Sequence, residues 1–193
     1  MDTELSDIKA YILIGGQSRR LQIDKSLVQL NKKSLTEIAH QNLSLLFKNI
    51  YIVGKVDHFR EYNFIPDIKP VQCPLNGIVT ALEHSQINWI FVIACDLPLV
   101  KTNIINYLYK RIDEDNQAVI PLVNNRLQPL CAFYHKSVLK VFNNALAEGN
   151  YSLMKLLDEI KVVKHTIPSA YEDQFLNINY PEDLNKAEKS LAR

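Results

Sequence analysis

Short apolar runs of strand length alternate with stretches of helical periodicity along this chain. The apolar runs lie at 10–14, 49–54, 88–96, 117–123, 129–135 and 161–167. Such alternation is typical of βα units around a mostly parallel sheet, and it predicts an α/β fold. The run "NWIFVIACD" at 88–96 is the most continuous one. We therefore expect it to be a central strand that is buried on both faces.

Helical signals fill the spaces between these runs. Ser34 and Glu37 have the spacing of a capping box, and apolar positions on one helical face follow them. Thr102 is placed to cap a helix that runs through Leu108. Further helices are predicted after Gly77, near 137–147, near 152–159 and over 180–192. Without a linker, low-complexity tract or internal repeat, the pattern predicts a single domain over 1–193.

Composition excludes several classes of protein. The chain has 193 residues, of which 47% are hydrophobic and 22% charged, so a sizeable core is expected rather than disorder. A formal net charge of +1 provides no general attraction to nucleic acid or to a membrane surface. No apolar run has the length of a membrane span, and the N-terminus lacks the pattern of a signal peptide. A cytoplasmic location is the expectation, and the three scattered cysteines predict neither disulfides nor a zinc site.

The first apolar run leads into the segment "GGQSRRLQIDK", where two glycines are followed by three cations. Adjacent glycines let backbone N–H groups approach an anion closely, and the carboxyl edge of an open α/β sheet is where ligands bind. The segment matches neither a Walker loop nor the dinucleotide fingerprint, because Gln17, Arg19 and Asp24 stand at the wrong positions. From these residues alone, a phosphate site and a tight turn with solvated cations both stay open.

Four segments together resemble one family. "LIGGQSRRLQIDK" is similar to the signature LAGGxSxRMGxDK of MobA-like nucleotidyltransferases. Three further segments follow in the family's order: "PDIKPVQCPLNGI" at 66–78, "ACDLP" at 94–98 and "FLNINYPEDL" at 175–184. The chain departs from the pattern at Ile14, Leu21, Gln22, Cys73 and Asn76. The resemblance implies a three-layer Rossmann-like nucleotidyltransferase fold with a mostly parallel central sheet.

The resemblance also implies an activity. Members of this family transfer GMP from GTP to the terminal phosphate of molybdopterin or of the molybdenum cofactor and release pyrophosphate, with Mg2+ as the cofactor. The implied partners are these two substrates, and beyond them a molybdenum insertion protein and molybdoenzyme apoproteins; no nucleic acid or membrane partner is expected. Such chemistry needs charge neutralisation, orientation and exclusion of water rather than a covalent nucleophile.

By the same resemblance, the triphosphate has candidate ligands. Arg20 and Lys25 would bind the β and γ phosphates, where negative charge develops on the leaving pyrophosphate. The backbone of Leu13, Ile14 and Gly15 would pass beside the purine and the phosphates. Asp96, at the end of a buried strand, would hold Mg2+, since that ion takes carboxylate and phosphate oxygens. The alternative for Asp96 is a helix cap.

Three other polar residues complete the candidate site. Asp67 would read guanine by accepting from its N1 and N2 donors, although a turn next to Pro66 is an equally good explanation. Asn177 and Asn179 alternate like strand neighbours and would bind the acceptor or support the metal, or else they shape the turn before the last helix. Two rival functions stay open: a cytidylyltransferase or other small-acceptor nucleotidyltransferase, and a nucleotide-binding module that has lost catalysis.

Overall fold

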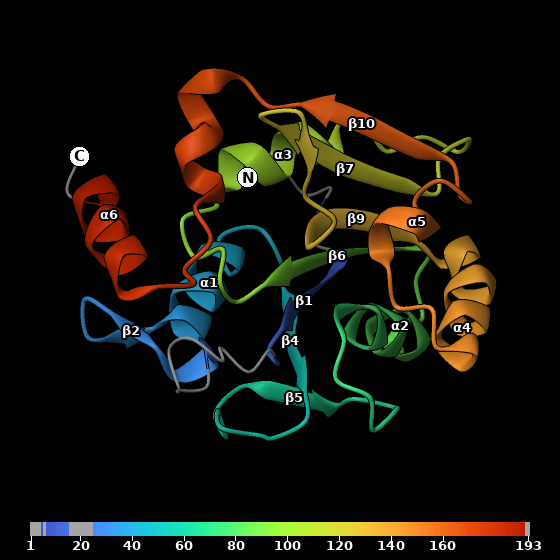
Figure 1. Cartoon of the computed structure of the whole chain (residues 1–193), viewed down its shortest axis with the longest axis horizontal. Coiled ribbons are helices and arrows are strands. Elements are labelled where there is room, and N and C mark those ends of the chain that lie inside the picture. The colour runs from blue at the N-terminus through green and yellow to red at the C-terminus, as the bar shows by residue number, and fades with distance from the viewer. Residues whose placement is uncertain (1–4, 6, 16–24, 192–193) are drawn as a thin grey trace.

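The structure is a computed structural model that describes residues 5, 7–15 and 25–191. Its described residues form an eight-stranded sheet in the order β10-β7-β9-β6-β1-β4-β5, with β8 paired to β7 (Figure 1). The strands are β1 Lys9–Leu13, β4 Asn49–Gly54, β5 Asn63–Pro66, β6 Trp89–Ala94, β7 Ala118–Val123, β8 Arg126–Leu127, β9 Cys131–His135 and β10 Val162–Thr166. A short hairpin, β2 Gln29–Leu30 with β3 Lys33–Ser34, stands apart from this sheet.

Most neighbouring strands of the sheet run in the same direction. β6, β1, β4 and β5 are parallel neighbours, and β10 is parallel to β7. β9 runs antiparallel to both β6 and β7, and the β7–β8 hairpin turns through Asn124 and Asn125, which have positive φ. The predicted α/β fold with a mostly parallel sheet is therefore confirmed. The carboxyl ends of β6, β1, β4 and β5 meet at one edge of the sheet, where ligand sites are expected.

Helices cover both faces of the sheet, which makes three layers (Figure 1). On one face, α1 Leu35–Leu43 and α3 Thr102–Tyr109 pack against side chains such as Ile12. On the other face, α2 Pro74–His84, α4 Leu139–Glu148 and α5 Leu153–Leu156 pack against side chains such as Tyr11. Because side chains alternate along a strand, β1 supplies both cores and is buried on both sides.

The last helix and the small hairpin form a separate apolar cluster beside these layers. α6 Pro181–Leu191 contributes Ala187, and the hairpin contributes Leu30. Ile178, just before α6, belongs to the same cluster and is fully buried. Three short 3-10 helices complete the described chain: η2 Lys25–Leu27, η3 Lys136–Val138 and η4 Ser169–Phe175. The cluster holds the segments around Lys25 and Ile178 close to the edge where β6 ends.

The helix predictions are confirmed in part. The capping box of α1 is present, with Glu37 N donating to Ser34 Oγ at 3.1 Å and Ser34 N donating to Glu37 Oε2 at 2.6 Å. α2 begins at Pro74 rather than after Gly77, because proline suits the first helical turn, where its missing N–H costs no bond. Thr102 as the cap is wrong: Lys101 occupies that position. α5 ends at Leu156, earlier than predicted, and β5 and the β2–β3 hairpin were not predicted.

Candidate functional site

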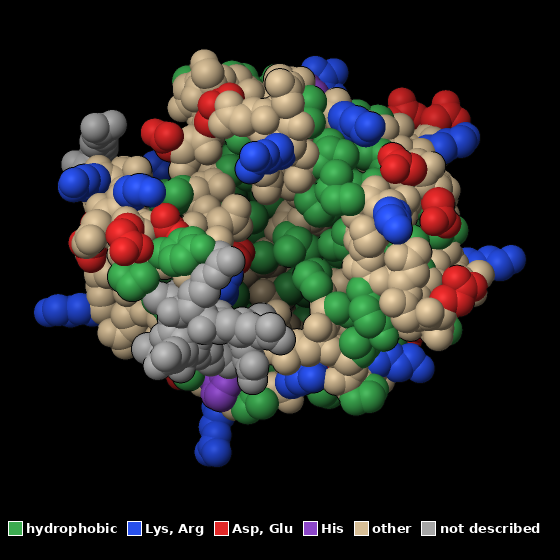
Figure 2. Space-filling model, viewed as in Figure 1, with side chains coloured by type: hydrophobic (Ala, Val, Ile, Leu, Met, Phe, Trp, Pro, Cys, Tyr) green, Lys and Arg blue, Asp and Glu red, His purple; other side chains and the backbone are tan. Residues whose placement is uncertain are grey.

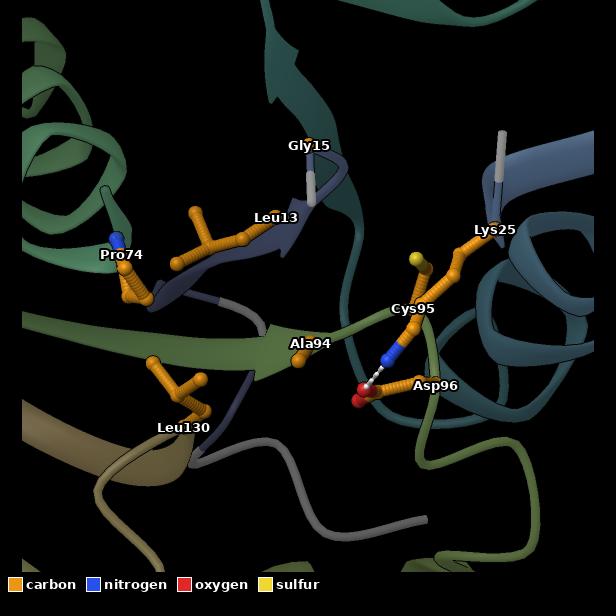
Figure 3. Close-up of a pocket in the computed structure, with 8 residues that line it drawn as sticks. All are labelled: Leu13, Gly15, Lys25, Pro74, Ala94, Cys95, Asp96 and Leu130. Carbon is orange, nitrogen blue, oxygen red and sulfur yellow. Dashed lines mark hydrogen bonds and ion pairs between the residues drawn. The ribbon is translucent and has the colours of Figure 1, made fainter. Parts of the chain in front are cut away.

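A pocket of about 200 Å³ lies at the carboxyl edge of the parallel strands. Its lining comes from the ends of β1 and β6, from η2, from the start of α2 and from the turn before β9 (Figure 3). The lining residues are Leu13, Gly15, Lys25, Pro74, Ala94, Cys95, Asp96 and Leu130. Figure 2 shows a hollow in the middle of this side of the molecule, with hydrophobic side chains along its floor. The apolar floor and the few polar groups are typical of a small-molecule site.

The end of β1 is held tightly between its neighbours. Ile14 N donates to Val53 O at 2.8 Å, and Cys95 N donates to Leu13 O at 3.1 Å. Gly15 then turns away from the sheet with a φ of 130°, a conformation that favours glycine. At the end of β4, a Cβ on Gly54 would lie 2.5 Å from the side chain of Ile14, so only glycine fits beside it. The predicted strand and glycine turn are thus present, and their backbone borders the pocket.

Three segments that are far apart in the sequence bring polar side chains together beside the pocket. Lys25 Nζ lies 3.0 Å from Asp96 Oδ2, although 71 positions separate the two residues (Figure 3). Lys25 Nζ also donates to Asn179 Oδ1. The side chains of Lys25 and Asp96 are 17% and 18% exposed, so a ligand in the pocket reaches them while most of the surrounding water is excluded. The geometry places the Lys25 and Asp96 side chains together, whereas their binding of one triphosphate and a divalent ion stays a prediction.

The backbone around Asp96 explains how the three segments meet. Asp96 lies in the turn after β6, and its carbonyl oxygen accepts from Ile178 N at 2.9 Å. This bond ties the segment before α6 to the end of the central strand. The helix that follows Asp96 is α3, and Lys101 stands at its N-cap. The alternative explanation of Asp96 as the cap of the following helix is therefore wrong.

The strand prediction for Asn177 and Asn179 is wrong. Their segment has no strand pairing and leads directly into α6. Asp183, the third residue of α6, reaches back over the helix start: its Oδ2 accepts from Asn179 N at 3.1 Å and from Tyr180 N at 3.0 Å. These bonds turn the chain so that the Asn179 side chain contacts Lys25. The structure brings Asn179 to the site, whereas a role for Asn177 stays a prediction.

Asp67 lies farther along the same edge, after β5, and does not line the pocket. Its backbone N donates to Gly54 O at 2.8 Å, which fixes the chain beside the end of β4. Its Oδ1 atom is buried and has no hydrogen-bond partner among the residues that the structure describes. Burial raises the pKa of the Asp67 carboxyl to about 6, and the positive charge of Lys55 acts in the opposite direction. An unpartnered buried carboxylate oxygen is able to accept a hydrogen bond from a ligand.

The donor set around Asp96 suits a hard divalent cation. Asp96 offers a carboxylate oxygen and Asn179 an amide oxygen, both in contact with Lys25 Nζ, and Mg2+ prefers oxygen ligands. Within the described part of the chain, no three His, Cys, Asp or Glu side chains are grouped closely enough to hold a metal by themselves. This composition fits an ion that keeps waters and takes substrate phosphate oxygens rather than one held in a protein cage.

Two further points complete the comparison with the predicted site. Arg20 lies outside the described residues, so its predicted phosphate role is not placed. Leu130 and Pro74 line the pocket but were not predicted as site residues. Ala94 N donates to Leu130 O at 2.8 Å, which sets the turn before β9 against the end of β6. The available signal for Leu130 is its place at the start of the predicted run at 129–135.

Comparisons with known proteins point to one family. A family described as the MobA-like NTP transferase domain matches residues 10–165. A molybdenum cofactor guanylyltransferase from Campylobacter jejuni subsp. doylei is 29% identical over 191 residues, which cover 97% of this chain and 99% of that protein. The molybdopterin-guanine dinucleotide biosynthesis protein A from Archaeoglobus fulgidus has a crystal structure with a TM-score of 0.82 and 28% identity. The match covers 96% of this chain and 99% of that one.

A more distant structure shows how widely the fold is shared. The 2-C-methyl-D-erythritol 4-phosphate cytidylyltransferase from Thermus thermophilus superimposes with a TM-score of 0.72. It is 13% identical, and the match covers 96% of this chain and 99% of that one. At this identity the likeness shows the fold alone.

No helix among the described residues is both long enough and apolar enough to cross a membrane.

Proposed function

This chain belongs to the MobA-like NTP transferase family, and we propose that it transfers GMP from GTP to molybdopterin or the molybdenum cofactor, releasing pyrophosphate. The observation that carries the proposal is the contact of 3.0 Å between Lys25 and Asp96 in a pocket at the carboxyl edge of the sheet. A cation for phosphates and a carboxylate for a divalent ion are both needed where a triphosphate reacts. The names and near-complete coverage of the relatives support the same assignment.

The proposed reaction is an in-line displacement at the α-phosphorus of GTP. A phosphate oxygen of the acceptor forms the new bond to phosphorus, and the bond to the bridging oxygen of pyrophosphate breaks. Lys25 exchanges its carboxylate partner for the β and γ phosphates and stabilises the charge that the leaving group gains. Asp96 and the Asn179 amide oxygen would hold Mg2+, which supplies charge neutralisation when bound. Arg20 would add a second cation at the phosphates.

The base would be read at the far end of the edge by Asp67. Guanine offers two adjacent donors, at N1 and N2, and one carboxylate accepts both. The buried Oδ1 of Asp67 has no partner in the described part of the chain, so a guanine that donates to this carboxyl satisfies a group that is otherwise unpaired there. The backbone of Leu13 to Gly15 lies between Asp67 and Asp96 in the order of the strands and would run alongside the nucleotide. The site thus has a base end and a phosphate end.

Two observations bear on the rival functions. The cytidylyltransferase structure shares only the fold, whereas the guanylyltransferase relative is similar over almost its full length. The inactive module was suggested by Gln22 and Cys73, which stand at glycine positions of the family pattern. Cys73 has φ −150° and ψ 153°, an extended conformation that any residue adopts, so this replacement introduces no backbone strain. Gln22 lies outside the described residues.

Docking with a molybdenum insertion protein and with molybdoenzyme apoproteins belongs to the proposal as well.

The test is a transfer assay with purified protein, Mg2+ and reduced molybdopterin, in which GTP, ITP, CTP and ATP are compared. We expect pyrophosphate release and a guanine dinucleotide product, identified by mass spectrometry, with GTP as the best donor. Asp67→Ala should lose the preference for GTP over ITP, which lacks the N2 amine. Efficient transfer from CTP alone would establish the cytidylyl alternative. GTP binding without pyrophosphate release would establish the inactive module.

A further inference from the structure

Two buried polar side chains of α2 hold the loop that joins Asp67 to Pro74. Asn76 Nδ2 donates to Lys69 O at 2.8 Å and to Val71 O at 2.9 Å. Thr80 Oγ1, one helical turn farther on, accepts from Ile68 N at 3.1 Å. Asn76 is 0% exposed and Thr80 is 1% exposed, so water does not compete for these bonds. The two side chains therefore bind the backbone of the loop at three residues, Ile68, Lys69 and Val71.

The loop has few other anchors. Ile68 is 40% exposed, and the side chains of Lys69, Pro70 and Gln72 are exposed as well. Val71 and Cys73 are partly buried against the core, so the stretch from Ile68 to Pro70 is the part of the loop that relies mainly on hydrogen bonds for a fixed conformation. Thr80 Oγ1 also donates to Asn76 O at 2.8 Å, so the hydroxyl uses both its donor and an acceptor lone pair. The loop is thus attached to α2 mainly through polar contacts that single substitutions can remove.

The attachment bears directly on Asp67. Asp67 N is bonded to Gly54 O, and the next residue, Ile68, is bonded through its N to Thr80. The backbone on both sides of the Asp67 side chain is therefore fixed, while its buried Oδ1 has no partner within the described residues. The fixed backbone limits the positions that the Asp67 carboxylate takes up, and such positioning is what recognition of a base by this group needs.

We propose that Asn76 and Thr80 are positioning residues that set the base preference by holding the Asp67 carboxylate in place. The proposal rests on the function proposed above, in which Asp67 reads guanine. Asn76 is one of the positions where this chain departs from the family pattern, which has alanine there. The Asn76 Oδ1 atom is buried, and none of the described residues pairs with it, a cost that the two bonds from Nδ2 offset. The bonds of Asn76 Nδ2 therefore fix the loop in this chain in a way that an alanine at this position of the family pattern does not.

The experiment measures kcat and KM for GTP and ITP in four variants. Asn76→Ala removes two bonds to the loop, and Thr80→Val removes the hydroxyl while keeping the shape. Thr80→Ser keeps the hydroxyl and serves as the rescue. Ser85→Ala is the matched control, because Ser85 is 2% exposed and caps the opposite end of α2. Thermal unfolding of each protein shows which variants are folded at the assay temperature.

We expect Asn76→Ala and Thr80→Val to lower the preference for GTP over ITP about tenfold. This is the factor for loss of one hydrogen bond to a charged group, here the bond from the guanine N2 amine to a displaced Asp67 carboxylate. The change should lie in a higher KM for GTP with kcat nearly unchanged, since binding rather than chemistry is affected. Thr80→Ser and Ser85→Ala should keep the wild-type preference. A merely structural role would lower stability without moving this ratio.

Two results would overturn the inference, and they differ in what else they remove. If Asp67→Ala loses the preference while folded Asn76→Ala or Thr80→Val keeps it, the positioning role is wrong and base recognition by Asp67 stands. If the wild-type enzyme does not prefer GTP over ITP, base recognition by Asp67 fails and the positioning role fails with it. Should Thr80→Val not fold, Asn76→Ala decides the question by the same ratio.

Discussion

The two ends of the candidate nucleotide site are built in opposite ways. At the phosphate end, the polar side chains already contact one another, with Lys25 bonded to both Asp96 and Asn179. At the base end, the Asp67 carboxyl has a buried oxygen that accepts no hydrogen bond from residues 5, 7–15 and 25–191. Both ends lie on the carboxyl edge of parallel neighbouring strands, so the difference comes from the side chains and not from the fold.

This difference separates two tasks of one site. At the phosphate end, ligand binding exchanges one set of charge-assisted contacts for another, so the net gain in affinity is small. These side chains therefore matter mainly for the stability of the transition state. At the base end, a ligand with suitable donors supplies a partner that the protein lacks, and a ligand without them leaves the carboxylate unpaired. We therefore expect substitutions at the phosphate end to change the rate and substitutions at the base end to change selectivity.

The largest effect is expected at Asp96. Asp96→Asn keeps the shape but removes the charge that would hold Mg2+, so transfer from GTP should fall by about a thousandfold or more. The fold should stay intact, because the Asp96 backbone bond to Ile178 does not depend on the carboxylate. Steady-state transfer rates and circular dichroism check the two statements. Undiminished turnover with Mg2+ in the folded variant would remove Asp96 from the metal role.

A smaller loss of rate is expected at Lys25. Lys25→Ala should lower kcat roughly a hundredfold, because developing charge on the leaving pyrophosphate loses its cation. Lys25→Arg keeps the charge and should recover part of the rate, although a guanidinium differs in geometry from an ammonium. Lys33→Ala is the control, since Lys33 is an exposed lysine that donates to Gln41. If Lys25→Ala raised KM alone, Lys25 would be a binding residue without a role in the chemical step.

At the base end, selectivity should depend on pH. Burial raises the pKa of the Asp67 carboxyl to about 6, and a protonated carboxyl no longer accepts from both guanine donors. The preference for GTP over ITP should therefore be full above this pKa and should fall as the pH drops through it. Measurement of kcat/KM for both nucleotides across this range tests the prediction. A preference in Asp67→Asn that falls with pH as steeply as in the wild type would assign the dependence to another group.

The smallest effect is on stability without ligand. Because the pKa of Asp67 is higher in the folded protein, the neutral carboxyl favours folding at low pH, and this contribution is lost as the pH rises through about 6. At about pH 8, Asp67→Asn should raise the free energy of unfolding by about 1 kcal/mol, less than the full shift because solvent screens a partly exposed group. The gain should disappear in acid. Urea unfolding at both pH values measures it, and a destabilised variant at pH 8 would contradict the unpaired state of the carboxylate.

Local patterns in the sequence were sufficient for much of the fold. The run at 88–96 contains the central strand β6, and Ser34 with Glu37 marks the start of α1. Both elements could be predicted because their causes, a continuous apolar run and a capping box, lie within a few neighbouring residues. β5 was missed because "NFIP" is short, partly exposed and lies at the sheet edge. The apolar positions after Gly77 indicate a helix but not its first turn, and α2 begins at Pro74, where proline suits the first helical position.

The candidate site depended more on contacts between distant segments. The meeting of Lys25 with Asp96 followed from the resemblance to a family, and no local pattern could have shown it. Polar residues alternate with Ile178 in the segment of Asn177 and Asn179, which predicts a strand. The same alternation also fits the turn before α6, whose conformation depends on the bond from Asn179 N to Asp183. The bonds of Asn76 and Thr80 to the loop after Asp67 were invisible for the same reason, since buried polar contacts leave no periodicity.

A crystal structure with bound GTP and Mn2+ tests the central claim most directly, because anomalous scattering locates the metal independently of the nucleotide. We predict the manganese at Asp96, the phosphates at Lys25 and the guanine N1 and N2 atoms within hydrogen-bond distance of the Asp67 carboxylate. A nucleotide bound away from the carboxyl edge, or a triphosphate that contacts neither Lys25 nor the Asp96-bound ion, would contradict the account.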